Sequence, residues 1–183
     1  MTATIVFIQG GGDGAHDEDA LLAGDLQRRL GDGFRVDFPP MPDEGNPDVV
    51  TWGPAIAAAI SKAEPPVVLV GHSIGGFVLL EQLAAQPPVE VRAIALIAVP
   101  FPSGDADWTF DGFDLPDLSA ALPRNAEVLL YAAEDDDTVP FAHRDLWATA
   151  IPGSATRTVD GGHQLANDLR VVADDIRQIV SSA

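Results

Sequence analysis

The chain has 183 residues and a formal net charge of −18, with 28 Asp or Glu residues against 10 Lys or Arg residues. This charge leaves no basic patch, which disfavours binding to a nucleic-acid backbone or to an anionic membrane. Because the chain contains no Cys, disulfide bonds, thiol catalysis and zinc–thiolate sites are excluded.

Length and hydrophobicity favour one globular domain over residues 1–183, since 46% of the residues are apolar. The longest apolar run, 93–101, is too short to cross a bilayer, which needs about 20 residues. The N-terminus lacks the basic and apolar pattern of a signal peptide, so we expect a cytoplasmic protein. The four His residues are scattered, and neither a metal site nor another cofactor is expected.

The first half of the chain alternates between apolar runs and helical patterns. Ile5–Ile8 is a continuous apolar run, typical of a buried parallel strand, and a glycine-rich loop follows at 9–14. Leucines then recur at helical spacing. A later segment alternates between apolar and polar residues, which is typical of a strand near a sheet edge. The predicted elements are strands at 5–8 and 34–38 and helices at 17–30 and 52–63.

The second half repeats this alternation. The predicted elements are strands at 67–70, 93–99, 128–132 and 155–159 and helices at 74–86, 141–151 and 165–180, with a turn of helix near Leu118. Such alternation predicts an α/β fold: a doubly wound, mostly parallel sheet of about six strands with helices on both faces. Active sites in these sheets lie at the carboxyl ends of the strands.

The junction of the third strand and third helix carries Gly71-x-Ser73-x-Gly75, the nucleophile-elbow pattern. A strand-to-helix turn this tight strains the serine backbone and exposes its hydroxyl. Side chains at positions 71 and 75 would collide with the neighbouring strand and helix, and Gly76 widens the clearance. The following helix directs its N-terminal N–H groups toward the place where an oxyanion would form. Ser73 is therefore the candidate nucleophile.

A serine nucleophile needs a general base and an acid that orients the base. The loop after the strand at 128–132 carries three consecutive Asp residues, 135–137, and the loop after the last strand carries His163. The order Ser, Asp, His along the chain is typical of α/β-hydrolases. At most one of the three carboxylates has this role, and the others are expected to be surface or capping groups.

The other three histidines are expected to have no catalytic role. His72 precedes the serine, and we interpret it as a residue that packs or hydrogen-bonds locally beside the elbow. His16 and His143 are expected at the surface, although His16 could reach the mouth of the site from the first loop.

These motifs resemble the small, cap-less bacterial serine hydrolases of the α/β-hydrolase superfamily, in particular those similar to retinoblastoma-binding protein 9. The family's Asp-x-x-Val-Pro pattern matches Asp136 to Pro140, and its Gly-His pair matches Gly162-His163. The resemblance implies a catalytic triad of Ser73, Asp136 and His163. It also implies a minimal fold that lacks the first two strands of the full fold and the cap domain.

The same resemblance implies an oxyanion hole made by backbone N–H groups. The expected donors are Ile74, which follows the nucleophile, and Gly11 in the first loop, with Gly10 as the alternative second donor. The segment 100–125 is too short for a cap domain. Its aromatic residues Trp108, Phe110 and Phe113 either fasten this loop to the core or form an apolar wall for the substrate.

Two alternatives come from other functional classes. Gly10-x-Gly12-x-x-Ala15 after a strand, with Asp37 at the end of the next, also fits a dinucleotide-binding fingerprint and hence an NAD-dependent oxidoreductase. A catalytically silent interaction protein could keep the hydrolase fold. Neither alternative accounts for the Ser, Asp and His motifs in matched loops.

The sequence therefore favours a serine hydrolase that acts through an acyl-enzyme on small carboxylic esters. The same catalytic residues cleave thioesters and amides, which are therefore alternative substrate classes. The acidic surface disfavours strongly anionic substrates and is compatible with adaptation to high salt. The oligomeric state does not follow from the sequence.

Overall fold

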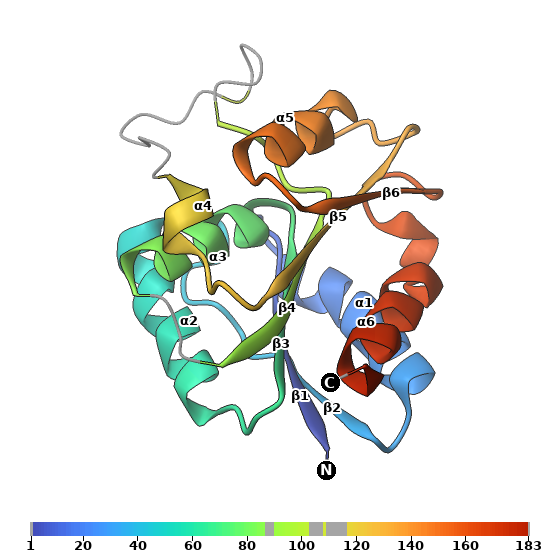
Figure 1. The fold of residues 1–183 in the computed structure, drawn as a ribbon. Helices are drawn as coiled ribbons and strands as arrows, with labels where there is room; N and C mark the ends of the chain where they lie inside the picture. The colour runs from blue at the N-terminus through green and yellow to red at the C-terminus, as the bar shows by residue number, and fades with distance from the viewer. Residues whose placement is uncertain (1, 87–89, 103–107, 109–116, 183) are drawn as a thin grey trace.

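The computed structural model describes residues 2–86, 90–102, 108 and 117–182. Six strands form one parallel sheet in the order β2-β1-β3-β4-β5-β6, as Figure 1 shows. The strands are β1 (Ala3–Ile8), β2 (Phe34–Asp37), β3 (Val67–His72), β4 (Val91–Ile97), β5 (Glu127–Ala133) and β6 (Ala155–Val159). This sheet confirms the predicted doubly wound fold, with the reversal of strand order between β1 and β3.

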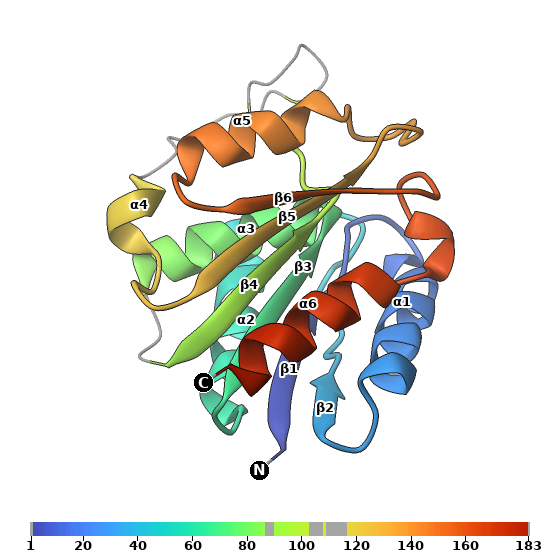
Figure 2. The same cartoon turned by 45° about the vertical axis from the view of Figure 1, so that its right-hand side comes forward.

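Helices cover both faces of the sheet, and Figure 2 shows α1 and α6 side by side on one of them. The helices are α1 (Ala15–Leu30), α2 (Val49–Lys62), α3 (Ser73–Ala85), α4 (Leu118–Ala121), α5 (Ala142–Ala150) and α6 (Arg170–Ser181). The short helix α4 confirms the turn predicted near Leu118. Helices α2, α3 and α5 contribute to the core on the opposite face from α1 and α6.

Strand β1 shows why a buried parallel strand is a continuous apolar run. Ile5 and Phe7 pack into the core under α1 and α6, whereas Val6 and Ile8 pack into the core under α2 and α3. Successive side chains point to opposite faces, and both faces are covered, so the run Ile5–Ile8 is apolar at every position. Strand β2 lies at the sheet edge and is only partly buried, as its alternating sequence predicted.

The last predicted helix, 165–180, is wrong at its beginning. A short 3-10 turn, η1 (Leu165–Asn167), precedes α6, which starts only at Arg170. All three residues of η1 have positive φ, between 47° and 56°, which interrupts an α-helix. The turn folds back on the preceding loop, where the N–H of Ala166 donates to the carbonyl of Gly161 at 2.8 Å. The apolar spacing alone did not reveal this turn.

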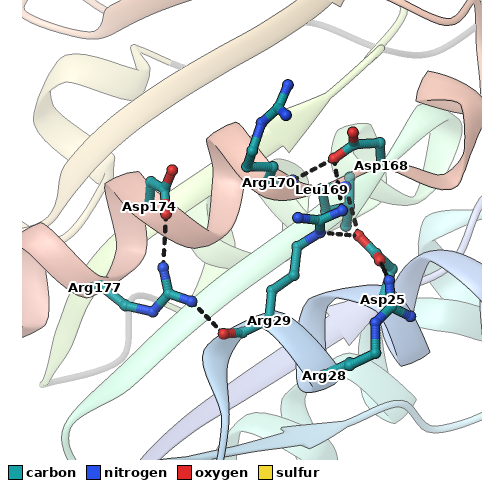
Figure 3. Close-up of polar contacts among 8 residues, drawn as sticks. All are labelled: Asp25, Arg28, Arg29, Asp168, Leu169, Arg170, Asp174 and Arg177. Carbon is teal, nitrogen blue, oxygen red and sulfur yellow. Dashed lines mark hydrogen bonds and ion pairs between the residues drawn. The ribbon is translucent and has the colours of Figure 1, made fainter.

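A buried carboxylate joins α1 to the start of α6, as Figure 3 shows. The side chain of Asp25 is 4% exposed and accepts hydrogen bonds from the backbone N–H of Leu169 at 2.8 Å and from Nε of Arg29 at 2.6 Å. Arg28 also pairs with Asp25, and Arg29 reaches Asp168 at 3.1 Å. Burial alone would raise the pKa of Asp25, but these hydrogen bonds and charges lower it below its usual value.

Candidate active site

Ser73 lies at the first residue of α3, directly after β3, in a strained backbone conformation. Its φ is +51°, a region that residues other than Gly adopt at a cost of about 1–3 kcal/mol. A Cβ atom at position 71 would lie 2.4 Å from Cα of Gly76, and one at position 75 would lie 1.8 Å from the carbonyl oxygen of Gln9. The surrounding backbone therefore admits only Gly at both positions, as the elbow pattern predicted.

The third glycine of the elbow is also required. A Cβ atom at position 76 would lie 2.4 Å from Cγ2 of Val99 and 3.1 Å from the carbonyl oxygen of Gly71. Gly76 therefore does more than widen the clearance, because it lets α3 approach β3 and the end of β4 closely.

Asp136 and His163 meet beside this turn. Nδ1 of His163 lies 2.9 Å from Oδ2 of Asp136. The other oxygen, Oδ1, accepts from the backbone N–H groups of Thr138 at 2.8 Å and Val139 at 2.9 Å. Burial would raise the pKa of Asp136, but the hydrogen bonds from His163, Val139 and Thr138 outweigh it and lower the pKa. Asp136 is thus held as a carboxylate.

The two neighbouring carboxylates have other partners. Asp135 accepts from the backbone N–H of Gly162 at 3.0 Å, and Asp137 accepts from the hydroxyl of Thr138 at 3.3 Å. Of the three, only the Asp136 side chain is buried against His163, with 1% exposure. The spacing to Val139-Pro140 therefore selected the carboxylate that contacts the His163 ring.

Ser73 and His163 line one cavity of about 410 Å³. The wall of this cavity also includes Gly11, Ile74 and Trp108. In the described part of the chain the Ser73 hydroxyl is not hydrogen-bonded to the His163 ring. A serine hydroxyl rotates freely, and catalytic hydrogen bonds often form only when substrate closes the site. The geometry brings Ser73 and His163 to one cavity surface.

The structure distinguishes between Gly10 and Gly11, the two alternative oxyanion donors in the glycine loop after β1. The N–H of Gly10 donates to Oδ2 of Asp19 at 2.7 Å and is therefore occupied. Gly11 faces the elbow: a Cβ atom there would lie 2.7 Å from Cγ2 of Ile74 and 2.6 Å from Cγ of Pro47. Ile74 is in the first turn of α3, where backbone N–H groups have no partner within the helix. Gly11 and Ile74 are thus neighbours at the cavity.

Glu44 holds this loop in place, a role that the sequence did not reveal. Its carboxylate accepts from the N–H of Gly14 at 2.8 Å, the N–H of His16 at 2.9 Å and the side-chain amide of Gln9 at 2.9 Å. The carbonyl of Glu44 also accepts from the N–H of Gly12 at 2.7 Å. These hydrogen bonds lower the pKa of Glu44. Glu44 lies in an irregular segment with no periodic pattern, so only the tertiary contact identifies it.

Asp19 and His72 form a second buried His–Asp contact next to the site. Their side chains are each 1% exposed, and Nδ1 of His72 lies 2.8 Å from Oδ2 of Asp19. Nε2 of His72 lies 3.1 Å from the backbone carbonyl oxygen of His163. His72 was expected to bond locally beside the elbow, but its partners come from α1 and from the loop after β6. Asp19 is one of several acidic residues in its helix, and nothing in the sequence indicated that it would be buried.

The prediction that His143 lies at the surface is wrong. Its side chain is buried, and Nδ1 accepts from the backbone N–H of Phe101 at 2.9 Å. Trp108 packs edge-on against this imidazole at 6.4 Å between ring centroids, while it also lines the cavity. The other aromatic residues of the predicted substrate wall, Phe110 and Phe113, lie outside the described residues.

No group of His, Cys, Asp and Glu suited to holding a metal ion occurs among the described residues. Within the same residues, no helix has the length and apolarity that crossing a bilayer requires.

Comparison with known proteins agrees with this architecture. Residues 21–168 match the family model described as serine hydrolase. The ydeN gene product from B. subtilis has a similar fold, with a TM-score of 0.76 and 21% identity over 99% of this chain and 100% of that chain. No curated protein matches this chain.

Two esterase structures are also similar. The esterase EaEST from Exiguobacterium antarcticum gives a TM-score of 0.67 at 14% identity, over 98% of this chain and 92% of its own. The esterase domain of a Rhodothermus marinus protein gives 0.62 at 20% identity, over 98% and 87%. At these identities the likeness shows the fold alone.

The family match covers most of the chain, and its matched range includes the elbow, the Asp loop and His163. The narrower resemblance to the retinoblastoma-binding protein 9 type stays a prediction. The six-stranded parallel sheet and its structural relatives identify a minimal α/β-hydrolase fold. This chain therefore belongs to the serine hydrolase family.

Proposed function

We propose that this protein hydrolyses small carboxylic esters through an acyl-enzyme, with Ser73, His163 and Asp136 as its catalytic triad. The observation that carries the proposal is the 2.9 Å contact between His163 and the buried Asp136, beside a cavity that the strained Ser73 also lines. We further propose that residues 1–183 act as one domain without a cap, which leaves the cavity open to varied substrates.

In the first half of the reaction, His163 takes the proton of the Ser73 hydroxyl while Oγ attacks the ester carbonyl. The imidazolium that forms is stabilised by Asp136 and then donates its proton to the leaving alcohol. The N–H groups of Gly11 and Ile74 stabilise the oxyanion, and donors of this kind contribute about 3–4 kcal/mol each. Water then attacks the acyl-enzyme by the same steps and releases the acid.

The cavity suggests which esters fit. Its volume of about 410 Å³ lies in the usual range for small-molecule sites. The described residues that line it include the acids Glu18 and Asp19 but neither Lys nor Arg. Because Glu18 places a carboxylate at this wall and neither Lys nor Arg lines it among the described residues, neutral esters are favoured over anionic ones.

The two alternatives from other classes have less support. A dinucleotide pyrophosphate would need the N–H groups of the glycine loop, but those of Gly10, Gly12 and Gly14 already donate to Asp19 and Glu44. A silent interaction protein would have no need of a buried carboxylate that orients an imidazole beside a strained serine. Thioesters and amides remain alternative substrates for the same residues.

The test is reaction with a fluorophosphonate probe, using the wild-type protein beside Ser73→Ala and His163→Ala. Intact and peptide mass spectrometry locates the adduct. We expect labelling at Ser73 that is lost in both variants, followed by turnover of short neutral esters in a chain-length panel. A folded wild-type protein that stays unlabelled at several salt concentrations would contradict the proposal and favour the interaction protein.

A further inference from the structure

Outside the triad, the most unusual feature near the site is the buried contact between Asp19 and His72. Oδ2 of Asp19 accepts from the N–H of Gly10 at 2.7 Å and lies 2.8 Å from Nδ1 of His72. Oδ1 accepts from the side-chain amide of Gln164 at 3.1 Å. The other ring nitrogen of His72 contacts the carbonyl oxygen of His163 at 3.1 Å.

Counting donors and acceptors defines the protonation of this pair. A backbone carbonyl only accepts, so Nε2 of His72 must carry a proton. Burial would raise the pKa of Asp19, but its hydrogen bonds and the His72 charge lower it, so Asp19 is a carboxylate and also only accepts. Nδ1 must then donate to Oδ2, so both ring nitrogens of His72 act as donors in these contacts. The titratable groups that contact it are Asp19 from α1 and His163 from the loop after β6.

We propose that Asp19 and His72 are positioning residues, whose buried ion pair fixes His163 and the glycine loop relative to Ser73. The inference rests on the proposed function. The pair contacts several parts of the proposed site. His72 directly precedes Ser73, and its Nε2–H donates to the backbone carbonyl of His163. Asp19 accepts from the N–H of Gly10, which is next to Gly11.

Stability alone does not explain the pair. Withdrawing two charges from water costs about as much as their attraction returns, so an apolar pair of the same volume would stabilise the fold equally well. What an apolar pair could not do is donate to the His163 carbonyl and accept from Gly10 and Gln164 at the same time. The ion pair therefore specifies geometry at the cavity wall.

Asp19→Asn tests the charge with little change of shape. The Asn oxygen can still accept from Gly10, and its amide can donate to Oε1 of Gln164, a buried atom without a hydrogen-bond partner among the described residues. This exchange needs only a flip of the Gln164 amide. Without the carboxylate, His72 has no anion to pair with and loses one of its two donors.

We expect Asp19→Asn to lower kcat about 10- to 100-fold with KM within about 3-fold, because small displacements of a catalytic base slow the reaction by this order. The matched control is Asp25→Asn, which removes the other buried acid of α1, whose carboxylate contacts Leu169, Arg28 and Arg29 and does not line the cavity. This variant should lower thermal stability but leave kcat within about 2-fold. Nitrogen-15 spectra should show a proton on both ring nitrogens of wild-type His72 and on one of them in Asp19→Asn.

Labelling of wild-type Ser73 is measured in the same series. It distinguishes failure of the proposed function from failure of the positioning role. No labelling of the wild type refutes the proposed function, while the spectra still test the ion pair. If the wild type reacts and Asp19→Asn reacts at the same rate, the positioning role is refuted and the hydrolase stands. A single ring proton on wild-type His72 refutes the ion pair. His72→Gln removes the charge from the other partner and must slow labelling too. This variant tests the positioning role if Asp19→Asn does not fold.

Discussion

Gly75 lies so close to Gln9 that a Cβ atom added to it would stand 1.8 Å from the Gln9 carbonyl oxygen. The contact joins the end of β1 to the first turn of α3, next to Ser73. Since backbone cannot yield as a flexible side chain does, the distance between the glycine loop and the elbow depends on the absence of a side chain here.

Gly75→Ala should therefore abolish turnover and labelling of Ser73, and lower the yield of folded protein. The matched control is Gly24→Ala in α1, where a Cβ atom would meet nothing within 4 Å. That variant should keep full activity and raise the free energy of unfolding by about 0.5–1 kcal/mol, because Ala favours the helix. Urea unfolding and ester turnover of both variants measure this difference, and an active Gly75→Ala would show that the elbow is looser than described.

Asp136→Asn should lower kcat about 10⁴-fold, as loss of the orienting carboxylate does in Ser-His-Asp enzymes. Asp137→Asn makes the same change from carboxylate to amide at the adjacent residue but leaves the His163 contact intact, so it should retain activity within about 3-fold. Steady-state ester hydrolysis compares the two. Equal losses in both variants would argue against Asp136 as the acid of the triad.

Glu44→Ala should reduce kcat and stability together, because it removes three hydrogen bonds to the glycine loop and the start of α1. Gly11 would also lose its fixed position. Asp43→Asn removes a charge from the same segment and keeps a residue that tolerates its φ of +49°, so it is the control. Thermal melts and kcat of both variants check the prediction, which an unaltered kcat in Glu44→Ala would refute.

Stability should fall as the solution is acidified below about pH 4, near the pKa of 3.9 of an Asp in the unfolded chain. The pKa values of Asp19, Asp25 and Asp136 are lowered in the folded protein. Groups of this kind stabilise the fold above their unfolded pKa and lose that contribution as pH falls through the folded pKa. Urea unfolding across this range measures the slope. Asp25→Asn should be less stable than the wild type at neutral pH, and its stability should depend less on pH below 4; an unchanged slope would contradict this account.

Local patterns in the sequence were sufficient for the fold class and for several residues of the candidate site, whose catalytic roles stay a prediction. Apolar runs such as Ile5–Ile8 indicate strands buried on both faces, and leucine spacing indicates α1, because both signals are set by neighbours a few residues away. The strained turn at Ser73 was also readable, since Gly71 and Gly75 are needed by the backbone within that same turn.

What the tertiary structure decided was which polar groups meet. The sequence does not show that Glu44 reaches Gly14, that Asp19 reaches His72 across 53 positions, or that His72 reaches the carbonyl of His163 across 91. Each of these contacts depends on the order of strands in the sheet, because that order brings together loops that are far apart in the chain. A carboxylate on a helix has the same local signature whether it faces water or a buried imidazole, so only the packed fold distinguishes Asp19 from its neighbours.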